Sequence, residues 1–119
     1  MDIEKLREYC LKKKGVTEGF PFGDDPLVFK VMGKMFCLVN LIPPLRVNLK
    51  CDPEKAIELR EKFDFVLPGY HMNKQNWNTI NLGEVVKPAL VYGWIDDSYN
   101  LVVDTFTKKL KEELRKIES

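Results

Sequence analysis

The segment that is richest in chemically capable side chains runs from Pro68 to Ile80. It combines the chain's one histidine with a lysine, several amides and Trp77. A lysine and backbone amides can bind phosphate groups, an indole ring can stack on a nucleobase, and asparagine side chains can read polar base edges. The candidate nucleic-acid contacts in this segment are therefore His71, Asn73, Lys74 and Asn78.

Some residues of this segment also have structural interpretations. A tryptophan that enters a strand is usually a core anchor, so we expect the ring of Trp77 to be mostly buried. On that interpretation, Trp77→Ala lowers the free energy of unfolding by about 3–5 kcal/mol. His71 follows a Pro-Gly turn, where bonding to the backbone is favoured over a role as a catalytic base, and Lys74 is the stronger functional candidate.

Charge is unevenly distributed along the chain, although the net charge is only +1. Residues 27–51 and residues 65–83 contain no acid. If these segments form one sheet, its polar face is positive and favours an anionic partner. Bases on strand exteriors also protect sheet edges from aggregation, so this second interpretation stays open. The bases in question are Lys30, Lys34, Arg46, Lys50 and Lys74.

The composition excludes several classes of protein. The chain has 119 residues, of which 45% are hydrophobic and 31% are charged, as in one soluble globular domain. No run approaches the roughly 18 apolar residues that a membrane span needs. Residues 1–4 carry acids where a secretion signal carries bases, so we expect a cytoplasmic protein with no membrane partner.

The sequence contains no recognisable catalytic or metal-binding constellation. It has no nucleophile elbow, phosphate-binding loop, dinucleotide-binding motif or zinc-protease motif. Cys10, Cys37 and Cys51 are odd in number and lack Cys-x-x-Cys spacing, so we expect buried, reduced thiols. We therefore predict that the protein is not an enzyme and needs no metal or other cofactor.

Hydrophobic periodicity and capping residues predict an α+β fold in a single domain, residues 1–119. Residues 16–26 are rich in glycine and proline and are expected to form a loop. Asp52 and Pro53 are typical of a helix start. Helices are predicted over residues 2–14, 52–63, 88–106 and 108–117, and strands over residues 27–32, 35–41, 45–50, 65–67 and 77–82.

Residues 45–50 alternate cleanly between apolar and polar types, which is typical of a strand with one packed face and one solvated face. We expect an antiparallel sheet that helices cover on one face. In this strand the helix-facing side chains should be Leu45, Val47 and Leu49, and the solvent-facing ones Arg46, Asn48 and Lys50.

Short motifs occur in a characteristic order along nearly the whole chain. They are Pro21-Phe22-Gly23, Val28-Phe29-Lys30-Val31, Gly33-Lys34-Met35-Phe36, Asn48-Leu49-Lys50-Cys51-Asp52-Pro53, Tyr70-His71-Met72-Asn73-Lys74, Trp77-Asn78-Thr79-Ile80 and Asp97-Ser98-Tyr99. In this order and spacing they resemble the MmcQ/YjbR family of small bacterial proteins. One position departs from the pattern, because Asn76 stands where many relatives have a histidine. If that histidine donates to phosphate in relatives, this chain lacks the group.

The resemblance implies a compact fold with a twisted antiparallel sheet of about five strands, similar to secretion-chaperone-like folds. It also implies DNA binding, with a double-wing arrangement of strand hairpins. We therefore expect a monomeric nucleic-acid-binding module that uses the basic sheet surface and residues 71–78. Two alternatives stay open, namely a protein-interaction or chaperone-like module and a small-ligand binder with a pocket near Tyr70, His71 and Trp77.

Overall fold

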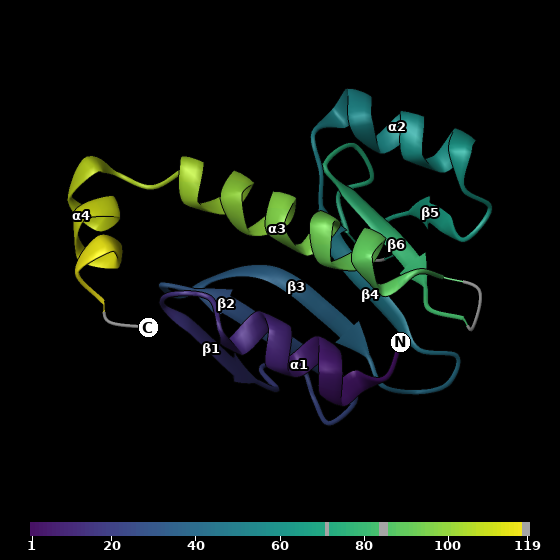
Figure 1. The fold of residues 1–119 in the computed structure, drawn as a ribbon, viewed down its shortest axis with the longest axis horizontal. Helices are drawn as coiled ribbons and strands as arrows, with labels where there is room; N and C mark the ends of the chain where they lie inside the picture. The colour runs from purple at the N-terminus through teal and green to yellow at the C-terminus, as the bar shows by residue number, and fades with distance from the viewer. Residues whose placement is uncertain (71, 84–85, 118–119) are drawn as a thin grey trace.

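The computed structural model describes residues 1–70, 72–83 and 86–117. These residues form four helices and one six-stranded antiparallel sheet with strand order β1-β2-β3-β4-β6-β5 (Figure 1). The single α+β domain predicted from the sequence is confirmed. The elements are α1 (Ile3–Leu11), β1 (Val16–Gly19), β2 (Pro26–Val31), β3 (Lys34–Asn40), β4 (Arg46–Lys50), α2 (Pro53–Lys62), β5 (Val66–Pro68), β6 (Trp77–Asn81), α3 (Pro88–Asp104) and α4 (Lys108–Lys116).

Helix boundaries follow the local capping signals. The side chain of Asp52 accepts a hydrogen bond from the Lys55 backbone amide, and Pro53 occupies the first turn of α2. At the start of α4, Thr107 accepts from the Leu110 amide in the same way. Such side-chain caps satisfy amide groups that have no partner inside the helix.

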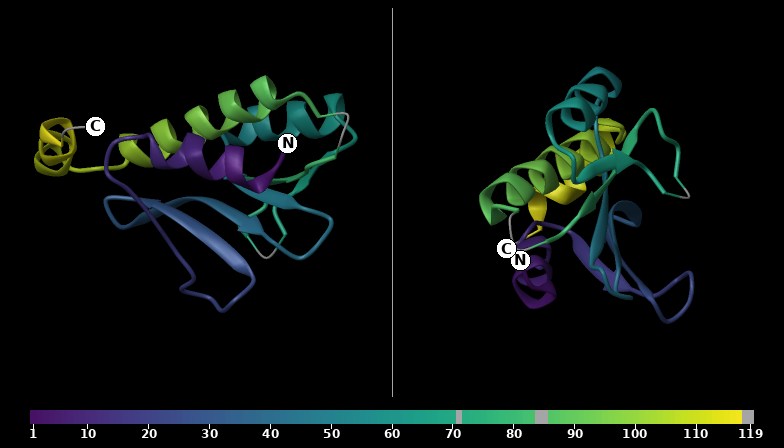
Figure 2. Two further views of the ribbon diagram at one scale, coloured as in Figure 1. Left: turned by 60° about the horizontal axis from the view of Figure 1, so that its bottom comes forward. Right: turned by 90° about the vertical axis from the view of Figure 1, so that its right-hand side faces the viewer.

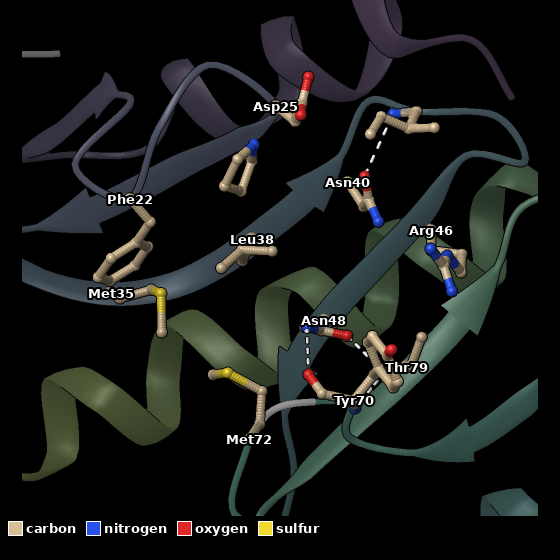
Figure 3. A pocket seen from close by; sticks show the side chains of 12 residues that line it. Phe22, Asp25, Met35, Leu38, Asn40, Arg46, Asn48, Tyr70, Met72 and Thr79 are labelled. Atoms are coloured by element: carbon tan, nitrogen blue, oxygen red, sulfur yellow. Dashed lines mark hydrogen bonds between the residues drawn. The ribbon is translucent and has the colours of Figure 1, made fainter.

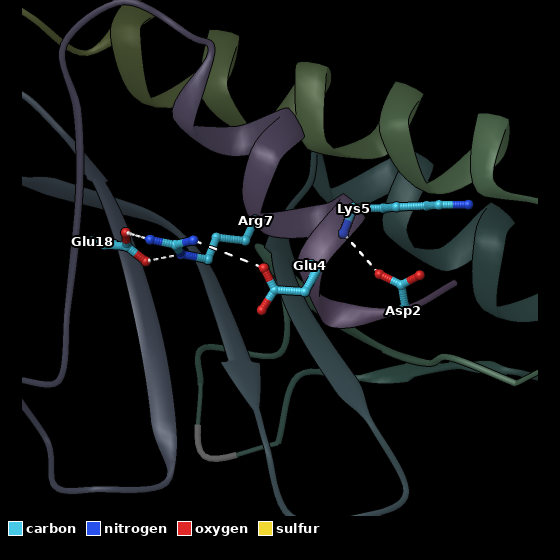
Figure 4. Close-up of polar contacts among 5 residues, drawn as sticks. All are labelled: Asp2, Glu4, Lys5, Arg7 and Glu18. Carbon is cyan, nitrogen blue, oxygen red and sulfur yellow. Dashed lines mark hydrogen bonds and ion pairs between the residues drawn. The ribbon is translucent and has the colours of Figure 1, made fainter.

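β1 was expected to be part of a loop, and that expectation is wrong. This short strand pairs with β2 along its whole length and forms one edge of the sheet. Arg7 of α1 holds it in place through two 2.7 Å hydrogen bonds to the carboxylate of Glu18 (Figure 4). A paired guanidinium and carboxylate of this geometry are stronger than a single ionic contact. The stabilising partner lies in another element, so the local sequence of β1 does not predict a strand.

The helices α1, α2 and α3 lie on one face of the sheet and enclose the core (Figure 2). Alternate residues of each strand point into this layer, among them Phe29, Val47 and Ile80, which are buried. An irregularity in the β2–β3 register places Phe36 and Cys37 in the core one after the other. Cys10, Cys37 and Cys51 are buried and free, as predicted.

The alternation predicted for residues 45–50 is confirmed for its apolar members, since Val47 and Leu49 are buried against the helices and Leu45 packs against the core. The prediction is wrong for Asn48, which is only 7% exposed. Asn48 does point away from the helices, but the chain that follows β5 covers it and bonds to it. Arg46 and Lys50 are half-buried.

The expectation that Trp77 is a core anchor is wrong as to place, because Trp77 lies outside the core cluster, although its side chain is partly buried. Trp77 is half-buried, pairs with Lys50 across the sheet and lies on the face opposite the helices. The core tryptophan is Trp94 of α3, which is 8% exposed. The ring of Trp94 lies 5.4 Å from that of Phe63 and thereby connects α3 to the end of α2.

A polar cluster joins α1 to α3 on the outer side of the core. The hydroxyl of Tyr9 donates a 2.8 Å hydrogen bond to the carboxylate of Asp96, which also pairs with Lys13. The ring of Tyr9 stacks on that of Tyr92 with centroids 4.1 Å apart. Burial, followed by the hydrogen bond to Asp96, raises the pKa of Tyr9 to about 12.

This shift predicts a loss of stability in alkali between about pH 10 and pH 12. In that interval the unfolded chain releases the Tyr9 proton while the folded chain keeps it, so proton release favours unfolding. Urea unfolding across this interval measures the loss, and tyrosinate absorbance follows the titration. The variant Tyr9→Phe should lose less stability than the wild type over the same interval, and an equal loss would contradict the assignment.

Candidate nucleic-acid interface

The face of the sheet opposite the helices is the candidate interface, and we call it the open face (Figure 2). Two cross-strand rows of side chains define it. The first row runs across five strands, and the second crosses four. The rows are Val28–Leu38–Asn48–Thr79–Leu67 and Pro26–Asn40–Arg46–Asn81.

A groove of about 490 Å³ lies on the open face (Figure 3). Its floor comes from the cross-strand rows and includes Leu38 and Thr79. Its walls come from loops, with Phe22 before β2, Ile42 after β3 and Tyr70 after β5. This volume lies within the range of about 300–1,000 Å³ that is usual for ligand sites. Three connections that are distant in the sequence therefore build one concave site.

A closed hydrogen-bond network fixes the Tyr70 wall. The Tyr70 amide donates to Thr79 Oγ1 over 2.8 Å, and the Thr79 hydroxyl donates to Asn48 Oδ1. Asn48 Nδ2 in turn donates to the Tyr70 carbonyl oxygen over 3.4 Å. The network satisfies two buried polar side chains and explains the burial of Asn48, because a buried amide without partners would be destabilising.

Arg46 carries the main hydrogen-bonding capacity of the groove. Its guanidinium carbon lies 5.6 Å from the centroid of the Tyr70 ring, a cation–π distance. Arg46 Nε is buried and has no acceptor among the described residues. Oδ1 of Asn81, its cross-strand partner, is also buried and has no donor among them. A buried donor without an acceptor is costly, so this atom is a natural contact point for a bound group or an ordered water.

Three aromatic residues of the open face each lie near a lysine or arginine. Tyr70 lies beside Arg46, and Trp77 pairs with Lys50 across β4 and β6. In the third pair, Phe20 and Lys30 line the same hollow next to β1. Phe20 is 51% exposed and Tyr70 is 56% exposed. The open face therefore has one cation–π contact, at Tyr70, and two further places where an aromatic residue and a basic residue are neighbours.

The predicted basic residues border the open face without meeting at one point. Lys30 and Lys50 lie on strands, Lys34 begins β3 at the hairpin turn, and Lys74 precedes β6. The Lys74 ammonium group lies 3.3 Å from the Gly69 carbonyl oxygen. Strands β2 to β6 contain no acid, as the charge distribution of the sequence indicates.

The amides of the segment 71–78 have different environments. Asn78 is only 2% exposed and lies on the helix side, where it accepts from Arg60 and donates to the Ala56 carbonyl. Asn78 therefore has no free edge for a nucleobase and cannot be a base contact in this structure. Asn73 is exposed and accepts a turn hydrogen bond from the Gln75 amide. His71 lies outside the described residues.

Sequence reasoning missed the apolar part of the site. Met35, Leu38 and Met72 line the groove, and Phe22 projects at its rim with 65% of its surface exposed. The one local signal was the Pro21-Phe22-Gly23 motif, because a phenylalanine between turn residues is seldom a core residue. The groove itself depends on tertiary contacts, which no local pattern reports.

A second group of bases was also missed, because it forms where α1 and α4 meet. Lys13, Lys14, Lys111 and Arg115 line one shallow hollow. Ion pairs with Asp96 and Glu112 compensate Lys13 and Arg115. Two of the four basic groups in this hollow are therefore partly neutralised.

The part of the chain that the structure describes contains neither a metal-binding cluster nor a membrane-spanning helix. No group of three or more histidine, cysteine, aspartate or glutamate residues there is arranged to hold a metal ion. Among the same residues, no helix is both long and apolar enough to cross a bilayer.

Comparison with known proteins identifies the family. The chain is 39% identical to the uncharacterised protein YbdF of Escherichia coli O157:H7 over 97% of this chain and 98% of that one. It is 31% identical to the uncharacterised protein YjbR of Escherichia coli K12, over 98% and 97% of the two chains. A crystal structure of Deinococcus radiodurans protein DR2400, domain DUF419, superposes with a TM-score of 0.88 at 39% identity, covering 94% of this chain and 86% of that one. The family model YjbR matches residues 11–101, and the chain belongs to the YjbR family.

Proposed function

We propose that this protein binds single-stranded nucleic acid on the open face of its sheet. The observation that carries the proposal is the cation–π contact of Arg46 with the Tyr70 ring. It is supported by two further places on this face where an aromatic and a basic residue are neighbours, Phe20 with Lys30 and Trp77 with Lys50. Nonspecific single-strand binding requires this combination, because rings stack on unpaired bases while cations follow the phosphates.

Single strands are favoured over duplex DNA by the shape of the face. Bases in a duplex are already stacked and present only their edges, whereas the exposed rings of Phe20 and Tyr70 offer flat surfaces. No helix of the described residues projects from the open face to enter a major groove (Figure 2). Duplex DNA can therefore bind this face only through contacts between its phosphates and the basic side chains.

Binding is expected to be weak and to show a moderate dependence on salt. Five basic side chains neutralise at most a few phosphates, and each phosphate contact contributes about 0.7 to the salt slope on single strands and about 0.9 on duplex DNA. The expected slope of log affinity against log salt concentration for single strands is between about −2 and −3.5.

Replacing Lys50 and Lys74 together with glutamine should reduce the affinity for single-stranded DNA several-fold in low salt. The slope should flatten by about 1.4, because two phosphate contacts are lost. Fluorescence polarisation with a labelled oligonucleotide at two salt concentrations measures both quantities. The effect should be similar for different base sequences, since phosphate contacts carry no sequence information.

The matched control is Lys5→Gln with Lys62→Gln, which removes two exposed lysines from the helix layer. This variant should retain the wild-type slope. An equal loss in both variants would show that net charge alone governs binding. If the wild type binds no oligonucleotide at high micromolar concentration in low salt, the proposal fails, and a protein-interaction or small-ligand role takes its place.

A further inference from the structure

The groove differs from the other places on the open face where an aromatic and a basic residue are neighbours. It is a concave site, and it contains a buried hydrogen-bond donor on Arg46. We infer that the groove is a subsite for one unstacked nucleobase, with a preference for guanine that Arg46 determines. This inference rests on the proposed function, since the base is part of a bound single strand.

The apolar surface of the groove suits a flat ring. Leu38 lies in the floor, and the thioether side chains of Met35 and Met72 line the sides. Phe22 and Met35 lie at one end of the groove, and Arg46 lies at the other (Figure 3). Methionine is flexible and polarisable and makes favourable contacts with aromatic rings, so these side chains can close on a planar base.

The polar groups of the groove favour a base over a simple anion. Arg46 supplies donors, one of which is buried and has no acceptor among the described residues. Asp25 is exposed and lies in the lining of the same groove, where its negative charge disfavours a free phosphate or a carboxylate ligand. A nucleobase carries both acceptors and donors on its edge and is compatible with both side chains.

Guanine is the base that matches Arg46. Its O6 and N7 atoms form a pair of acceptors that an arginine can bind together, and this is the commonest specific contact in protein–DNA complexes. The Tyr70 ring lies beside the guanidinium and limits its movement. The amino group of guanine remains available for the carboxylate of Asp25.

The test uses short thymidine oligonucleotides that differ only in the central residue, which is guanine, adenine, thymine or an abasic site. The wild type should bind the guanine strand roughly tenfold more tightly than the abasic strand, as one good arginine–guanine pair implies. The variant Arg46→Lys keeps the charge and should lose this preference while its salt slope stays that of the wild type.

A second variant keeps the test independent of Arg46. Leu38→Trp fills the groove and should also abolish the preference for guanine, whereas Leu67→Trp, a control on the same cross-strand row but outside the groove lining, should retain it. If the wild type binds all four strands equally, or if Arg46→Lys still prefers guanine, the base subsite is refuted and the proposed function stands. If no strand binds at all, the proposed function fails together with the subsite.

Discussion

Trp94→Ala should lower the free energy of unfolding by about 3–5 kcal/mol, as truncation of a buried aromatic side chain does. Trp94 is 8% exposed, and its ring contacts those of Phe63 and Phe65, so the change removes the link between α3 and the segment after α2. Since a domain of this kind is stable by only about 5–15 kcal/mol, the loss is a large share of the total. Urea unfolding followed by far-ultraviolet circular dichroism measures it.

The matched control for this prediction is Trp77→Ala. Trp77 is half-buried and lies on the open face, so its removal should cost only about 1 kcal/mol. The same variant should weaken oligonucleotide binding, because one stacking surface disappears. If Trp77→Ala destabilised the fold as much as Trp94→Ala, Trp77 would be packed as a core residue and would not belong to the open face.

Ser98→Ala should destabilise the protein by roughly 2–4 kcal/mol, because each buried group that loses its partner costs about 1–3 kcal/mol. The Ser98 hydroxyl accepts from the Lys50 amide over 2.9 Å and donates to the Phe36 carbonyl oxygen over 2.5 Å. These two residues lie one position beyond the last β3–β4 pair, Cys37 with Leu49. The Ser98 side chain therefore bridges β3 and β4 just beyond the last residue pair of the two strands.

Thr105→Ala is the control for the Ser98 prediction. Its hydroxyl bonds to the Val102 carbonyl within the same helix and lies at the surface, so water can replace it. The expected loss is below about 1 kcal/mol. A Ser98→Ala variant as stable as the wild type would mean that a water molecule or a backbone shift satisfies Phe36 and Lys50.

The elements that the sequence predicted correctly are those with strong local signals. Asp52 and Pro53 mark the start of α2, and the alternation around Val47 marks β4, since capping and the period of two depend only on neighbouring residues. β1 lacked such a signal, because it has only four residues and one of them is a glycine. The residue that pairs with its Glu18 is Arg7, which lies in helix α1.

For the candidate site, the sequence predicted only the distribution of charge. The acid-free strands were visible in the sequence, but the environments of Asn48 and Asn78 depend on partners far along the chain. Both side chains are strand amides, but their environments differ. Asn48 supports the wall of the groove, whereas Asn78 lies beneath α2. The assignment of Trp77 and Trp94 failed for the same reason, because burial of a tryptophan depends on which elements pack over it.

The position of β5 at the edge of the sheet links the groove to local unfolding. β5 pairs only with β6 among the described strands, and the chain after it forms the Tyr70 wall. Opening of this edge would expose the amides of Gly69 and Tyr70, which bond to Trp77 and Thr79, while the central strands stay closed. We expect these two amides to exchange hydrogen for deuterium faster than those of β3 and β4. An occupied groove should slow that exchange, so a ligand would be detectable as local protection at the edge before any change in global stability.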